Sequence, residues 1–83
     1  MELKSTWEKV LEYATMPLHG TLSRKQRKGV KLQINNGEIY ENAIIFLEES
    51  IVWVSETING EVSNTYYDWN MITSIKTISK EEK

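Results

Sequence analysis

The apolar residues near the N-terminus recur with the period of a helix. Four of them share one helical face at the i, i+3, i+4 and i+7 spacing: Trp7, Val10, Leu11 and Ala14. Ser5 and Glu8 have the spacing of a capping box, and Pro17 disfavours a helical backbone at the residue before it. We therefore expect a helix over residues 5–15. A helix of about eleven residues is not stable alone in water, so its apolar face must pack on the rest of the chain, with Trp7 as the anchor.

From residue 30 onwards the apolar period is that of β-strands. Residues 30–34 alternate between apolar and polar side chains, as a half-buried strand does. Residues 35–37, Asn-Asn-Gly, tolerate the left-handed backbone of a tight turn. The long strand that follows, residues 38–47, is apolar on both faces after Ala43, which indicates a bend. A two-residue and a three-residue loop at 35–37 would turn opposite faces of this strand inward, and the sequence leaves both open.

A second hairpin is indicated further along the chain. Residues 51–54 are typical of a strand, and Asn59-Gly60 is the strongest hairpin signal in the sequence. A two-residue loop there places two pairs of side chains opposite each other: Trp53 with Tyr66, and Val52 with Tyr67. Residues 68–71 then indicate a tight corner, and residues 72–78 indicate the last strand.

Together these patterns predict one mainly β domain, residues 1–83, with one N-terminal helix and a five-stranded, strongly bent antiparallel sheet over residues 30–78. A chain of 83 residues has room for one core. It contains no cysteine, so good packing or self-association must supply what disulfides supply elsewhere. We expect the charged tail, residues 79–83, to fray. The first residues lack the features of a signal peptide and no apolar run could span a bilayer, so we expect a cytoplasmic protein without membrane contact.

The net charge of −2 is unevenly distributed. Residues 13–37 carry five positive side chains and no negative one, so the remainder of the chain carries −7. The five are Arg24, Lys25, Arg27, Lys28 and Lys31. Most of them belong to a basic connector, residues 18–29, in which a helical turn over residues 23–28 is an option. The cluster has two interpretations: a solvated connector, or an edge that contacts the phosphates of a nucleic acid.

The sequence offers little for catalysis. It contains one histidine, His19, one aspartate, Asp68, and no cysteine. No nucleophile elbow, no metal-ligand spacing and no glycine-rich phosphate loop is present. We therefore expect a protein that is not an enzyme and that needs no metal or other cofactor.

The residues from Arg24 to Ile78 resemble the Sm-like family of small β-barrels, most closely its Hfq-like members. The resemblance lies in Asn36-Gly37, an apolar residue three positions later, Ile44, Phe46 and the final Ile72-Thr73-Ser74-Ile75. The sequence departs from the family pattern at three places. Asn42 stands where the family has glycine, Leu47 where it has aspartate, and Trp69-Asn70 where it has the Lys-His pair that lines its RNA pore.

The resemblance implies an Sm-like or SH3-like barrel that binds nucleic acid, RNA in particular, as a ring-forming homo-oligomer. Phosphates would be contacted by the five basic residues, and bases by three further residues: Tyr40, Trp69 and Asn70. Core or interface packing is the other interpretation of these aromatic residues. The alternative function is a protein–protein interaction or regulatory module without nucleic-acid binding, in which the barrel offers an aromatic groove or a sheet edge to a partner.

Overall fold

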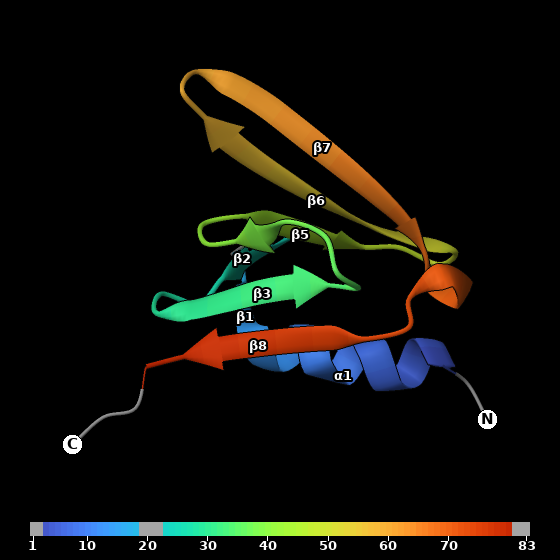
Figure 1. Cartoon of the computed structure of the whole chain (residues 1–83). Helices are drawn as coiled ribbons and strands as arrows, with labels where there is room; N and C mark the ends of the chain where they lie inside the picture. The colour runs from blue at the N-terminus through green and yellow to red at the C-terminus, as the bar shows by residue number, and fades with distance from the viewer. Residues whose placement is uncertain (1–2, 19–22, 81–83) are drawn as a thin grey trace.

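The structure is a computed structural model that describes residues 3–18 and 23–80. Figure 1 shows how the helices and strands of this described part are arranged. The helices are α1 (Leu3–Ala14) and the 3₁₀-helix η1 (Trp69–Met71). The strands are β1 (Thr15–Pro17), β2 (Ser23–Gln26), β3 (Val30–Ile34), β4 (Ile39–Tyr40), β5 (Ile44–Leu47), β6 (Ile51–Ile58), β7 (Glu61–Asp68) and β8 (Ile75–Ser79).

The strands form two antiparallel sheets, with the orders β1-β2-β5-β6-β7 and β4-β3-β8. This confirms a mainly β fold with one helix. The expected long strand 38–47 is divided into β4 and β5, which lie in different sheets, because the chain bends at residues 41–43. Asn42, in this bend, has no positive φ, so it does not use the left-handed backbone that glycine would allow. The ladders of the described residues do not close the two sheets into a barrel.

The core draws residues from the helix and from both sheets. Its buried members are Leu11, Ala14, Leu32, Ile34, Tyr40, Ala43, Ile45, Val52, Val54, Trp69 and Ile72. The expected apolar face of the helix is confirmed, since Leu11 and Ala14 are fully buried and Trp7 is half-buried against the core. Within the described residues, no helix has the length and apolar character required to cross a membrane.

The helix boundaries differ from the predicted ones. Because α1 spans Leu3–Ala14, Ser5 and Glu8 lie inside it and do not form a capping box at its start. The helix ends at Ala14, because Thr15 pairs with Gln26 as the first residue of β1. The Thr15 hydroxyl donates to the carbonyl oxygen of Leu11 at 2.6 Å, which satisfies one carbonyl of the last turn.

The prediction of a connector over residues 18–29 was wrong for its second half. Residues 23–26 form β2, which lies between β1 and β5, so there is no helical turn at 23–28. The sequence does not predict this strand, because a strand is recognised by alternating apolar residues and the two buried side chains of β2, Ser23 and Gln26, are polar. His19 lies outside the described residues.

The hairpin at Asn59-Gly60 is confirmed. The two residues have φ values of 54° and 81°, the left-handed backbone that a two-residue loop requires. The register of β6 and β7 places Trp53 opposite Tyr66 and Val52 opposite Tyr67, as predicted.

The turn after β3 is the three-residue alternative. Leu32 pairs with Tyr40 and Gln33 with Ile39, a register that leaves residues 35–37 in the loop. Asn35 has a φ of 58°. This register directs Tyr40 into the core and leaves Ile39 46% exposed.

The C-terminal corner is confirmed as η1, but the last strand begins three residues later than expected. Thr73 and Ser74 are held outside any ladder, because their backbone N–H groups donate to Oδ1 of Asn35 at 2.8 and 3.3 Å. Of the predicted frayed tail, Ser79 belongs to β8, while residues 81–83 lie outside the described residues.

Candidate nucleic-acid interface

Two of the five basic residues are engaged by the end of α1. The Arg24 guanidinium donates to the Thr15 hydroxyl at 2.7 Å and to the Glu12 carbonyl oxygen at 3.3 Å. Arg27 donates through Nε to the Tyr13 carbonyl oxygen at 2.7 Å. The last carbonyls of a helix lack partners within it and carry a partial negative charge. Arg24 and Arg27 therefore stabilise the helix terminus, and their contact with phosphate stays a prediction.

The three lysines of the basic segment are exposed, and a fourth lysine joins them. Lys25 and Lys28 line one hollow of about 390 Å³, and Lys31 and Lys80 line a second of about 390 Å³. The two hollows share Gly29 and therefore adjoin. In the described part of the chain none of the four lysines forms an ion pair. We call Lys25, Lys28, Lys31 and Lys80 the lysine rim.

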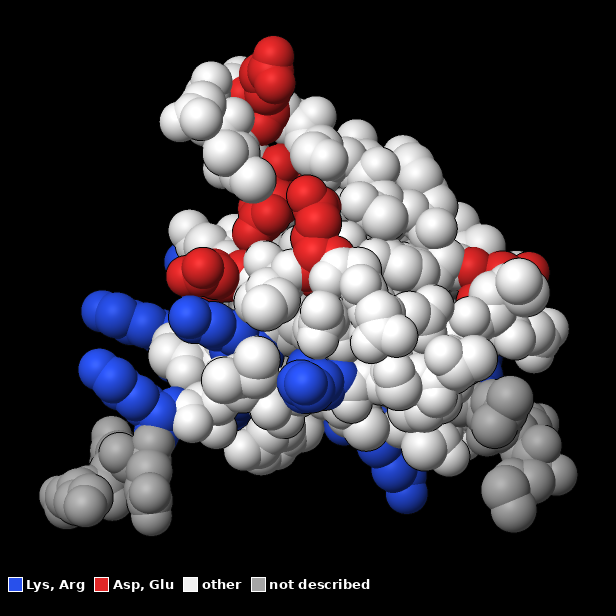
Figure 2. Space-filling model, in the orientation of Figure 1, with Lys and Arg blue, Asp and Glu red and all other residues white. Residues whose placement is uncertain are grey.

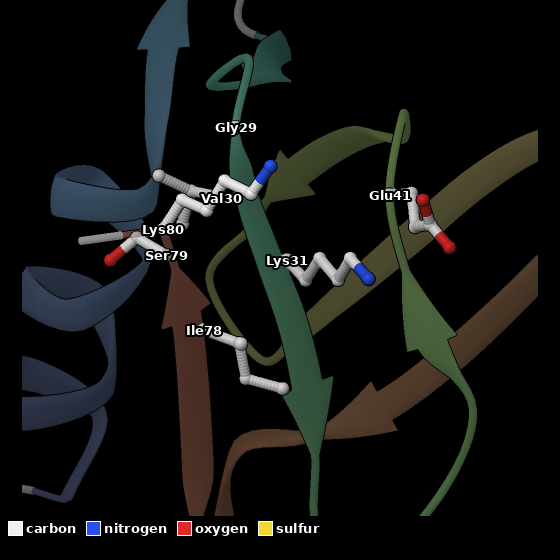
Figure 3. A pocket seen from close by; sticks show the side chains of 7 residues that line it. All are labelled: Gly29, Val30, Lys31, Glu41, Ile78, Ser79 and Lys80. Carbon is white, nitrogen blue, oxygen red and sulfur yellow. The ribbon is translucent and has the colours of Figure 1, made fainter. Parts of the chain in front are cut away.

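Sequence reasoning missed Lys80. It lies next to Val30 because Val30 pairs with Ser79, the last residue of β8. Figure 3 shows the Lys80 side chain extending over the start of β3 and the Lys31 side chain extending toward Glu41. No local signal in the sequence links residues 31 and 80, since only the register between β3 and β8 brings them together.

A buried glutamine holds the turn that carries the lysine rim. Gln26 is 2% exposed, and its amide nitrogen donates to the carbonyl oxygens of Val30 at 2.7 Å and Tyr40 at 2.6 Å. Its amide oxygen accepts from the N–H of Ala43 at 3.1 Å. Gly29, in the same turn, has a φ of 86°, which glycine adopts without strain. The turn between β2 and β3 is thereby fixed to the bend between β4 and β5.

An acidic residue borders both hollows of the rim. Glu41 lines each of them, and its backbone N–H donates to Glu56 on the β6–β7 hairpin at 3.2 Å. Figure 2 shows acidic side chains running down from this hairpin and basic side chains gathered below them. The lysine rim is therefore bounded on one side by negative charge.

The three residues expected to contact bases are not brought together with the rim. Tyr40 is 2% exposed and Trp69 is 3% exposed, so neither ring is available for stacking, and core packing is the correct interpretation of both. The indole N–H of Trp69 donates to the Glu48 carbonyl oxygen at 2.9 Å. Asn70 is exposed, but it lies in η1 and lines neither hollow of the rim.

The Tyr40 hydroxyl is paired with another phenol. The hydroxyl oxygens of Tyr40 and Tyr67 lie 2.8 Å apart. Burial raises the pKa of Tyr67 above its ordinary value, and the contacts with Tyr40 and the charge of Glu38 raise it further. Tyr67 is therefore neutral at physiological pH, and its hydroxyl contact with Tyr40 is a polar link between β4 and β7.

An aromatic row crosses the outer face of the five-stranded sheet. The rings of Phe46 and Trp53 stack with centroids 3.9 Å apart, and Trp53 stacks on Tyr66 at 5.4 Å. The indole N–H of Trp53 donates to the Glu48 carboxylate at 2.6 Å. In the sequence, the predicted pairing of Trp53 with Tyr66 indicates two members of this row. Phe46 stands out there only as part of the pattern that resembles the Sm-like family. Trp53 is therefore stacked on both sides, while Tyr66 at the end of the row remains 60% exposed.

The described residues contain no group of three or more His, Cys, Asp or Glu side chains that could hold a metal ion. Comparison with family models, with curated proteins and with solved structures gave no match to this chain.

Proposed function

We propose that this chain is a non-enzymatic binding domain that engages the phosphates of single-stranded RNA with its lysine rim. The observation that carries the proposal is the rim itself, four exposed lysines around two adjoining hollows on one side of the molecule. Lysine is a flexible point charge, suited to a mobile phosphate chain. A positive surface that tracks the backbone is one part of how proteins bind single strands without sequence preference, the other being aromatic side chains that stack on the bases.

The strand order supports an Sm-like arrangement as part of this proposal. If β4 and β5 are treated as one bent strand, the two sheets join into the order β8-β3-β4/β5-β6-β7. Each strand of that series then lies beside its neighbour in the chain, except that the last strand returns beside the first. This is the order of a small five-stranded barrel of the Sm-like or SH3-like kind, to which β1 and β2 add a hairpin.

We propose a narrower set of residues for this contact. We leave out Arg24 and Arg27 because their guanidinium groups donate to the end of α1, and Tyr40 and Trp69 because they are buried. Lys80 joins it. What remains is a surface for phosphates without an adjacent aromatic platform, so we expect binding with little base preference.

Titration of a short fluorescent oligo-U at several salt concentrations tests the proposal. Each lysine that neutralises a phosphate of a single strand contributes about −0.7 to the slope of log K against log salt, so a rim of four gives about −3. Lys28→Ala and Lys31→Ala should each weaken binding and reduce the slope by about 0.7. Oligo-A should bind with similar affinity.

The matched control is Lys9→Ala, which removes the same charge from an exposed position on α1 that lines neither hollow. It should leave affinity and slope almost unchanged. Absence of binding at low salt, or equal effects of Lys9→Ala and Lys28→Ala, would refute the proposal and favour a module that binds only protein.

A further inference from the structure

The longest open strand edge among the described residues belongs to β7. This strand ends the five-stranded sheet, with β6 on one side and no described strand on the other. The hairpin of β6 and β7 projects away from the three-stranded sheet (Figure 1). Proteins usually protect such an edge from pairing with charged side chains, lysine above all, with proline or with a bulge. β7 contains no lysine or proline, its two charged residues, Glu61 and Asp68, are its first and last, and its pairing with β6 is continuous, so the middle of the edge is open to another strand.

Alternate residues of β7 direct their backbone groups toward this open edge. Just past the strand, the N–H of Trp69 donates to the carbonyl oxygen of Ser50 at 3.4 Å. Hydrogen-bonded pairs recur at every second position of an antiparallel ladder, so the odd-numbered residues of β7 bond to β6. The residues with N–H and C=O groups facing the open edge are Val62, Asn64, Tyr66 and Asp68.

The same residues carry the apolar surface of the strand. Val62 is 63% exposed and Tyr66 is 60% exposed. Both lie on the outer face of the sheet, because Tyr66 is opposite Trp53 and side chains alternate between faces along a strand. Tyr66 is the outermost ring of the aromatic row, and nothing in the described chain continues the row beyond it.

We propose that β7 pairs with β7 of a second copy of this chain, antiparallel and about a two-fold axis at Asn64. In this register Val62 of each copy lies opposite Tyr66 of the other, and Asn64 lies opposite itself. The two five-stranded sheets join into one continuous sheet. The interface is self-complementary, as a two-fold axis requires.

The side chains select this register among the alternatives. A shift by one residue would place the outward-facing side chains of one strand opposite the inward-facing side chains of the other, so the outer faces of the two sheets would not match. A shift by two places Val62 opposite either Asp68 or Asn64, and the apolar pairs are lost. In the proposed register a β-branched residue faces an aromatic one twice, which is a favourable cross-strand pair. Asp68 lies opposite Gly60 and Glu61 opposite Tyr67, so no two acidic residues face each other.

Sedimentation of the full chain at rising concentration tests the dimer. Because the joined edge is narrow, we expect a mass that rises from one chain to two between low micromolar concentrations and about 1 mM. Val62→Lys should weaken association about tenfold or more, because it replaces the apolar pair at both ends of the interface. Thr57→Lys is the matched control. Thr57 is exposed and directly opposite Val62 on the same face, but on β6, so association should persist.

A cysteine at position 64 tests the axis. Hydrogen-bonded partners in an antiparallel pair have Cα atoms about 5.5 Å apart, within the range that a disulfide spans. The chain has no other cysteine, so under mild oxidation Asn64→Cys should form a covalent dimer much faster than Thr57→Cys.

A monomer throughout, equal crosslinking of the two cysteine variants, or a larger assembly in which Asn64→Cys does not crosslink would each overturn the proposal. Circular dichroism of each variant checks that it is folded. The proposal is independent of RNA binding, since the lysine rim contributes no residue to β7 and these measurements contain no nucleic acid.

Discussion

At the scale of single residues, Gln26 supplies side-chain hydrogen bonds to the backbone at the bend between β4 and β5. Gln26 lies beside the bend where β4 gives way to β5, within hydrogen-bond distance of the carbonyl of Tyr40 and the N–H of Ala43. The Gln26 amide bonds to both, and to Val30 as well. Buried backbone groups without partners lower the stability of the fold, so the hydrogen bonds of this one side chain stabilise the bend.

We expect Gln26→Ala to lower the free energy of unfolding by about 3 kcal/mol, because it removes three hydrogen bonds to backbone groups at a buried site. Urea unfolding measures the change. Gln33→Ala is the control, since the Gln33 amide also donates to a carbonyl, that of Gly37, but at an exposed site where water replaces it. It should cost less than about 1 kcal/mol. Equal losses in the two variants would contradict the role given to Gln26.

A second residue-scale prediction concerns Tyr67. Its pKa is raised in the folded chain above the value of about 10 that it has when unfolded. The folded state therefore keeps the proton when the unfolded state has lost it. The stabilising contribution is complete below about pH 10 and is lost as the pH rises through the folded pKa.

Unfolding of the native chain and of Tyr67→Phe at pH 8 and at pH 11 tests this. Groups common to both proteins titrate alike and cancel in the comparison. Stability of the native chain should fall more steeply with pH than that of the variant. Parallel falls would show that Tyr67 does not favour its protonated form on folding.

At the scale of elements, hydrogen bonds from two arginines connect the end of α1 to the five-stranded sheet. Arg24 comes from β2 and Arg27 from the residue after it, and both donate to carbonyls in the last turn of the helix or just beyond it. The backbone continues this junction, because the N–H of Arg27 donates to the Ala14 carbonyl oxygen at 2.9 Å. The helix is too short to be stable alone, so this junction and its apolar face both matter.

We expect Arg24→Ala to lower the free energy of unfolding by about 1–2 kcal/mol, since it removes charge-assisted hydrogen bonds at a half-buried site. Arg24→Lys should recover only part of this, because an ammonium cannot reproduce the guanidinium fork. Urea unfolding followed at the far-ultraviolet helix signal measures both. Lys28→Ala removes a positive charge from the same segment at an exposed position and should change stability by less than about 0.5 kcal/mol. A loss of similar size in Lys28→Ala would mean that the segment stabilises only through its general charge.

At the scale of the whole molecule, charge is separated between two regions. The lysine rim extends from β2 through the start of β3 to the residue after β8, and the acidic side chains extend over the β6–β7 hairpin (Figure 2). Glu41 lies at the boundary of the two regions. A ligand phosphate in either hollow would therefore meet two lysines and one carboxylate.

Removal of that carboxylate should strengthen RNA binding. Glu41→Gln removes about 0.5–1 kcal/mol of repulsion at low salt, so oligo-U affinity should rise about two- to fivefold. The gain should shrink as salt screens the site. Glu49→Gln is the control, because Glu49 lines a separate hollow with Phe46 and Leu47. A gain of equal size in Glu49→Gln would indicate a response to net charge alone.

The sequence by itself determined the elements that depend on local pattern. The apolar face of the helix follows from 3.6-residue periodicity, and the Asn59-Gly60 hairpin follows from residues that accept a positive φ. From that hairpin the pairing of Trp53 with Tyr66 could be counted directly, because a two-residue loop fixes the register of both strands.

Only the tertiary structure decided which residues of the basic segment are free. The sequence pattern predicts the same role, contact with phosphates, for Arg24 and Lys25, because both are cations in one short segment. The fold sets Arg24 against the helix end and leaves Lys25 in solvent. It also buries Tyr40, exposes Ile39, and brings Lys80 into the lysine rim from the far end of the chain. Periodicity and turn chemistry act over a few residues, whereas burial and ion placement depend on which strands meet, and no local pattern contains that information.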